Sequence, residues 1–114
     1  MAEELAREIV AGAADKKAQD AVVLAMGDAV SFTDFFVIVT GATPRQTRSI
    51  AEGIILKLRP GHRPARAEGE REGEWILIDY LDVVVHVFTP AARDFYRLET
   101  LWGDVPRLEL PAED

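Results

Sequence analysis

Hydrophobic and polar positions in the first third of the chain predict one helix followed by two strands. Over residues 3–13, apolar side chains recur at helical spacing, which indicates a helix with one apolar side. Residues 20–27 form a short apolar run that ends at a turn signal. Residues 34–40 are β-branched and aromatic throughout, which is typical of a strand that is covered on both faces of a sheet.

A second helix is predicted from its start and stop signals. Thr43 is a favourable N-cap, Pro44 suits the first helical position, and Gln46 completes a capping box. An apolar stripe at helical spacing follows, and Pro60 ends the helix. Ordinary capping is favoured at this helix start over an anion-binding site. The polar residues 63–69 are expected to form a short edge strand.

The most hydrophobic run, residues 74–88, reads as two antiparallel strands that also carry two carboxylates and an imidazole. A two-residue turn at positions 80–81 would place Asp79 opposite Asp82. This register makes one face wholly aliphatic and leaves the other a mixture of apolar and ionisable side chains. The aliphatic face contains Ile76, Ile78, Val83, Val85 and Val87. The mixed face contains Trp75, Leu77, Asp79, Asp82, Val84, His86 and Phe88.

The aliphatic face is expected to lie in the core, and the mixed face is the candidate functional surface. Its apolar side chains would be a liability on a bare surface, so a partner is expected to cover them. Acids around aromatic anchors favour a basic protein, because the anchors supply affinity and the charges supply orientation. Leu81 opposes the two-residue turn, since positive φ is costly for a branched side chain.

Thr89 and Pro90 mark the start of a last helix. This helix is expected to run toward Trp102, for which core packing is favoured over a dimer contact. The acidic, proline-containing segment 105–114 is predicted to be a poorly ordered tail, which leaves residues 1–104 as a single domain. The order of elements predicts an α/β (α+β-like) fold, in which helices pack on a mixed β-sheet.

Composition and charge narrow the possible functions of the 114-residue chain. Its hydrophobic fraction of 48% allows a modest core, and the lack of cysteine excludes disulfides and thiolate metal sites. The start is acidic and no long apolar run follows, so we expect no signal peptide, no membrane span and a cytoplasmic protein. The net charge of −7 disfavours direct contact with nucleic acid, because phosphate affinity comes from Lys and Arg.

Asp82 and His86 are the residues that would support an enzymatic reading. Nucleotidyltransferases hold Mg²⁺ with two acids spaced two residues apart on a strand, but the second position here is Val84. His86 has no second His and no Cys nearby, so an imidazole packed beside Trp75 is favoured over a general base or a metal ligand. We therefore expect no catalytic residue, no metal and no cofactor. The alternative is a small metal-dependent nucleotidyltransferase or nucleotide-binding domain.

Three segments in order resemble the ribosomal silencing factor family, also called the Iojap family: TDFFVIVTGATPRQ, EWILIDYLDVVVHVF and RDFYRLETLWGD. The resemblance implies a degenerate nucleotidyltransferase fold without catalysis. It also implies binding to the large ribosomal subunit through its protein number fourteen, at the face that meets the small subunit. A factor bound there would block subunit joining and damp translation in nutrient shortage. Family members are similar in forming homodimers when free, so a homodimer is expected.

The resemblance also implies which residues bind the partner. The family usually writes the hairpin turn as Asp-Tyr-Gly-Asp, and this chain departs from that pattern at Leu81. The docking surface of the family carries over onto most of the mixed face and adds the tyrosine of the turn. The expected partner-binding residues are Trp75, Leu77, Asp79, Tyr80, Asp82, Val84, His86 and Phe88.

Overall fold

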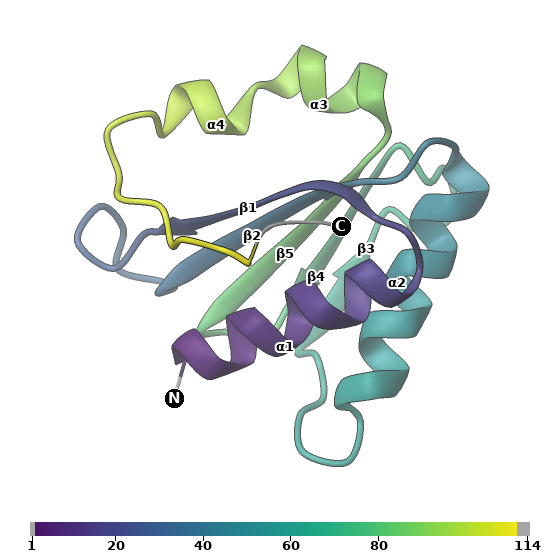
Figure 1. The fold of residues 1–114 in the computed structure, drawn as a ribbon, viewed down its shortest axis with the longest axis horizontal. Coiled ribbons are helices and arrows are strands. Elements are labelled where there is room, and N and C mark those ends of the chain that lie inside the picture. The colour runs from purple at the N-terminus through teal and green to yellow at the C-terminus, as the bar shows by residue number, and fades with distance from the viewer. Residues whose placement is uncertain (1, 112–114) are drawn as a thin grey trace.

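Helices cover both faces of one mixed β-sheet in the computed structural model, which describes residues 2–111 (Figure 1). The elements follow in the order α1 (Ala2–Asp15), β1 (Gln19–Ala25), β2 (Phe35–Thr40), α2 (Pro44–Leu58), β3 (Arg66–Glu68), β4 (Trp75–Asp79), β5 (Val83–Phe88), α3 (Pro90–Tyr96) and α4 (Leu98–Leu101). Within the described residues, the strands form a five-stranded sheet in the order β1-β2-β5-β4-β3. Strands β2 and β5 are parallel, and the other neighbouring strands are antiparallel. The predicted mixed sheet with helices packed on it is confirmed.

Helices α1 and α2 pack on one face of the sheet and enclose the larger core cluster. Helix α1 buries Leu5 and Ile9, and helix α2 buries Ile50 and Ile54. Beneath them the predicted aliphatic face is confirmed, with every member fully buried at 0% exposure: Ile76, Ile78, Val83, Val85 and Val87. Burying such a side chain stabilises the fold by about 1.5–3 kcal/mol, which decides the face of the hairpin that points inward.

The start of α2 confirms the predicted capping. Thr43 Oγ1 accepts a hydrogen bond from the Gln46 amide at 3.1 Å, and Gln46 Oε1 accepts one from the Ala42 amide at 2.7 Å. The Thr47 amide donates to the Thr43 carbonyl at 2.9 Å. These donors are therefore satisfied by the chain itself, as ordinary capping requires.

The β4–β5 hairpin has the predicted faces but not the predicted register. Asp79 lies opposite Val84 instead of Asp82. Because side chains alternate between faces with a period of two residues, this even shift leaves every side chain on its predicted face. The predicted turn at residues 80–81 is wrong, and the turn lies at residues 81–82.

The predicted last helix is instead two short helices, α3 and α4, on the opposite face of the sheet (Figure 1). Arg97 separates them, because its backbone is left-handed with φ of 50°. Leu98 and Trp102 pack against a second core cluster on this face. The predicted core packing of Trp102 is confirmed.

The segment after α4 returns along β1, which differs from the predicted poorly ordered tail. The Ala25 amide donates to the Pro106 carbonyl at 2.8 Å, and Leu108 packs against the larger core cluster. Strand β1 is at the edge of the sheet, so the segment satisfies backbone groups that would otherwise face solvent. The prediction therefore does not describe residues 105–111, and residues 112–114 lie outside the described part of the chain.

Candidate partner-binding face

The structure divides the predicted partner-binding residues between a surface and the layer beneath it. Trp75, Leu77 and Asp79 of β4 are half-buried. Asp82 lies in the turn and is exposed. The remaining four are buried: Tyr80 is 7% exposed, Val84 6%, His86 4% and Phe88 1%. These four side chains support the surface but do not offer themselves to a partner, which corrects their expected role as contacts.

Tyr80 is the clearest of these corrections. Its side chain lies in the larger core cluster, on the aliphatic side of the hairpin. Its hydroxyl is buried and has no hydrogen-bond partner within residues 2–111. Burial raises the pKa of Tyr80 to about 12. The phenol is therefore a neutral core group at physiological pH.

Trp75 is the largest side chain of the surface and is held by its aromatic neighbours. Its indole Nε1 donates to His86 Nδ1 at 3.1 Å, so the predicted packing of the imidazole beside Trp75 is confirmed. The ring centroid of Trp75 lies 5.2 Å from that of Phe88 and 4.5 Å from that of Tyr96. Tyr96 comes from α3 and is 46% exposed. We call the following set the acid–aromatic face: Trp75, Leu77, Asp79, Asp82 and Tyr96.

His86 is a neutral support for Trp75. Burial lowers the pKa of His86 to about 4. The indole N–H can only donate, so Nδ1 is the acceptor and Nε2 carries the hydrogen. Nε2 has no hydrogen-bond partner among the described residues, and the ring lies edge-on to Phe36 at 4.7 Å between centroids. A group held in this way positions a neighbour and is poorly placed to move protons.

The protein should lose stability in mild acid because of His86. Its folded-state pKa lies below the usual 6.5 at about 4, so its stabilising contribution is complete above pH 6.5 and is lost as the pH falls toward 4. The loss between about pH 7.5 and about pH 4.5 should be roughly 2–3 kcal/mol. Urea denaturation at the two pH values measures it. His86→Phe should lose less stability over the same range, and an equal loss in both proteins would contradict the assignment.

Asp79 shapes the hairpin turn, whereas Asp82 is free for a partner. Asp79 Oδ1 accepts a hydrogen bond from the Leu81 amide at 2.8 Å, and its Oδ2 lies 3.5 Å from Arg66 Nε on β3. The Asp82 carboxylate makes no hydrogen bond and no ion pair within the described part of the chain. Asp82 is therefore the acid of this face that is most available to a cation.

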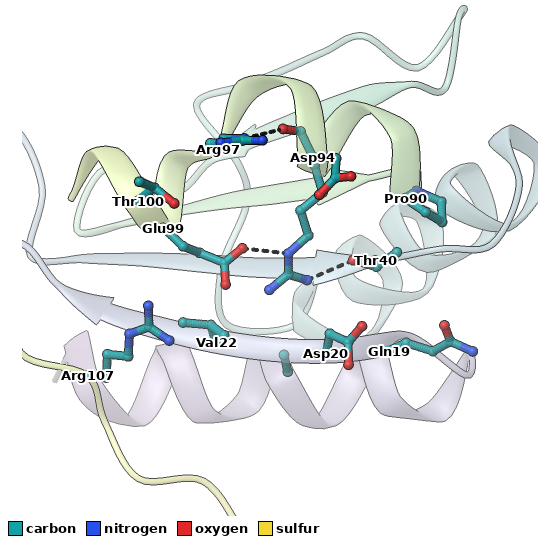
Figure 2. Close-up of a pocket in the computed structure, with 12 residues that line it drawn as sticks. Gln19, Asp20, Val22, Thr40, Pro90, Asp94, Arg97, Glu99, Thr100 and Arg107 are labelled. Atoms are coloured by element: carbon teal, nitrogen blue, oxygen red, sulfur yellow. Dashed lines mark hydrogen bonds and ion pairs between the residues drawn. The ribbon is translucent and has the colours of Figure 1, made fainter. Parts of the chain in front are cut away.

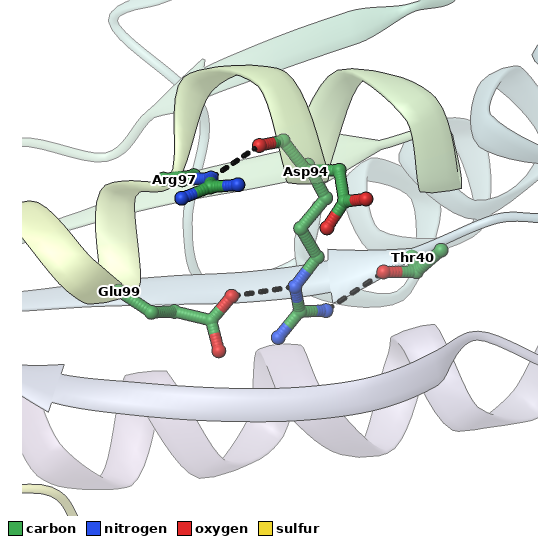
Figure 3. A network of polar contacts seen from close by, with 5 residues as sticks. Thr40, Asp94, Arg97 and Glu99 are labelled. Carbon is green, nitrogen blue, oxygen red and sulfur yellow. Dashed lines mark hydrogen bonds and ion pairs between the residues drawn. The ribbon is translucent and has the colours of Figure 1, made fainter.

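Arg93 fastens α3 and α4 over the sheet (Figure 3). Its Nε donates to Glu99 Oε1 at 2.7 Å, and its Nη1 donates to Thr40 Oγ1 at 2.7 Å. We call these two contacts the Arg93 clasp. The hydrogen bond from Arg93 lowers the pKa of Glu99, with the charges of Arg93 and Arg107 helping and partial burial opposing. By holding α3 in place, the clasp keeps Tyr96 against Trp75.

An open cleft lies between β1 and the α3–α4 segment, beside the clasp (Figure 2). Its volume is about 970 Å³, and none of the predicted partner-binding residues lines it. Its charged lining is balanced between arginines and acids: Arg93, Arg97 and Arg107 against Asp20, Asp94 and Glu99. A balanced lining gives little net attraction for an ion of either sign. The cleft is therefore a weaker candidate site than the acid–aromatic face.

The described residues do not assemble a metal centre. Within residues 2–111, no group of three or more His, Cys, Asp or Glu side chains could hold a metal ion. Asp82 lies in the turn, and the buried Val84 occupies the strand position of a second carboxylate. In the same range, no helix has both the length and the apolar character that crossing a membrane requires.

Comparisons with known proteins give one consistent result. A family model described as "Ribosomal silencing factor during starvation" matches residues 1–114. The ribosomal silencing factor of Halalkalibacterium halodurans is 40% identical over 109 residues, which is 95% of this chain and 93% of that protein. The chloroplastic Iojap protein of Arabidopsis thaliana is 35% identical over 107 residues, which is 94% of this chain and 45% of that protein. A crystal structure from Chromobacterium violaceum matches with a TM-score of 0.88 at 33% identity, covering 98% of this chain and 91% of that chain.

Proposed function

The chain belongs to the ribosomal silencing factor family, and we propose that it represses translation by docking its acid–aromatic face on the large ribosomal subunit. The contact would be protein number fourteen of that subunit, at the face that meets the small subunit. A factor seated there would block subunit joining and so damp translation in nutrient shortage. The proposal includes a homodimer of the free chain and no catalytic step.

Trp75 is the observation that supports this proposal most strongly. Its half-exposed ring is already fixed by His86 and Tyr96, so little conformational entropy is lost when a partner covers it. The exposed Asp82 and the net charge of −7 favour a basic protein as the partner. Exposed charge pairs are screened by salt, so the complex should weaken as ionic strength rises.

An order-of-addition assay tests the proposed function. Large subunits that are incubated with the protein before small subunits are added should yield fewer whole ribosomes in a sucrose gradient. The same amount of protein added after joining should have a smaller effect, because the small subunit then covers the docking site. Normal joining at saturating protein concentration would contradict the proposal.

A further inference from the structure

Leu81 is an exposed leucine in a backbone conformation that leucine rarely adopts. Its φ is 73°, and its side chain is 63% exposed. The Asp82 amide donates to the Tyr80 carbonyl at 3.0 Å, which closes a three-residue turn around Leu81. Positive φ strains a residue that has a Cβ, whereas glycine adopts it freely and asparagine tolerates it. The turn therefore holds a residue that its backbone does not favour.

This turn is held firmly at the end of the sheet. The Leu81 amide donates to Asp79 Oδ1 at 2.8 Å, and the Asp82 carbonyl accepts a hydrogen bond from the Asp34 amide at 2.9 Å. Asp34 belongs to the loop before β2, in which Phe32 is 65% exposed. Two adjoining loops thus hold exposed apolar side chains at the same end of the sheet, among acidic residues.

The packing of the chain gives no reason for a leucine at this position. Within the described residues, neither core cluster includes Leu81. A polar residue or glycine would satisfy the turn with less strain and less exposed apolar area. Strained residues persist where the surrounding structure holds them and a function needs them.

We propose that Leu81 is a second apolar anchor that extends the acid–aromatic face and enters an apolar depression on the same basic protein partner. The inference rests on the proposed function and adds to it a residue that sets specificity. Asp79 and Asp82 lie on either side of Leu81 in the chain, at the turn end of β4, and Trp75 lies at the other end of the same strand. One basic partner lying along β4 would therefore meet both apolar anchors and the acids beside Leu81. Because the turn is fixed before binding, ordering the leucine costs little entropy on docking.

Glycine at position 81 separates the effect of the leucine side chain on stability from its effect on binding. Leu81→Gly should keep the Tm at or above the wild-type value, because relief of the strained φ offsets the greater freedom of unfolded glycine. Its affinity for purified large subunits should fall by about tenfold, as expected when an anchor leaves its pocket. Leu81→Asn should show the same pattern, since asparagine also tolerates positive φ. Anisotropy titration of labelled protein and thermal denaturation measure the two effects.

Leu56 provides a matched control, because it is 59% exposed on α2, away from the acid–aromatic face. Leu56→Gln should leave the affinity unchanged. Unchanged affinity of both Leu81 variants would overturn the inference, and so would a lower Tm in both, because the leucine would then serve the fold of the chain. If the proposed function is wrong, the wild-type protein itself shows no saturable binding to large subunits. If only the inference about Leu81 is wrong, the wild-type protein still binds.

Discussion

Replacing Trp75 with alanine should lower the affinity for large ribosomal subunits by about a hundredfold, because a central aromatic anchor contributes about 2–4 kcal/mol and each 1.4 kcal/mol is about tenfold. Trp75 has the features of such an anchor. Its Nε1 is fixed 3.1 Å from His86 Nδ1, and its ring lies 4.5 Å from that of Tyr96. Co-sedimentation of the variant with large subunits through a sucrose cushion measures the loss.

Trp75→Phe is the graded companion of this variant. Phenylalanine keeps an aromatic surface but loses the N–H that bonds His86, so its affinity should lie between those of the wild type and Trp75→Ala. Circular dichroism and thermal denaturation of each variant show whether the fold is kept. If a folded Trp75→Ala protein binds large subunits with wild-type affinity, Trp75 is not part of the docking surface.

Replacing Arg93 with methionine should lower the free energy of unfolding by about 2–3 kcal/mol. The variant removes both hydrogen bonds of the clasp and leaves Glu99, whose side chain is 27% exposed, without the cation that is hydrogen-bonded to it. Methionine keeps an apolar stem of similar length, so the loss reports mainly the polar contacts. Urea denaturation measures the stability, and amide hydrogen exchange should become faster in α3 and α4.

Arg97 offers a matched control for the clasp, because it is exposed on the same cleft. Its side chain donates to the Asp94 carbonyl at 3.0 Å and has no ion pair within residues 2–111. Arg97→Met should therefore change stability by less than about 0.5 kcal/mol. If Arg93→Met loses as little stability as Arg97→Met, the clasp does not hold α3 and α4, and apolar packing alone does.

The layers of the fold were predictable because the periodicity of apolar residues decides which side of an element is buried. The same period of two sorted the hairpin faces correctly even though the register was wrong. The register depends on the turn, and the turn contains Leu81 at a φ of 73°, a conformation that residue preferences argue against. The turn is stabilised by a hydrogen bond that the Leu81 amide donates to Asp79 Oδ1, and a strand pattern does not reveal such a side-chain interaction.

The division of the mixed face into accessible and buried side chains could not be predicted from the sequence. It depends on where α3 and α4 lie, and their position depends on the clasp between Arg93 and Thr40, which are 53 residues apart. No local spacing rule links such positions. The same limit applies to Tyr96, which joins the surface only because α3 brings it onto Trp75. Tertiary contacts therefore decided which of the predicted residues remain accessible.

A photocrosslink from position 77 tests most directly whether the acid–aromatic face docks on the large subunit. Leu77 lies on β4 and is half-buried on this face, so benzoylphenylalanine at this position keeps Trp75 in place and would contact the partner. After irradiation with purified large subunits, we expect a crosslink to protein number fourteen, and none from the same probe at the exposed Leu56 on α2. A crosslink to that protein from position 56 but not from position 77 would contradict docking through this face.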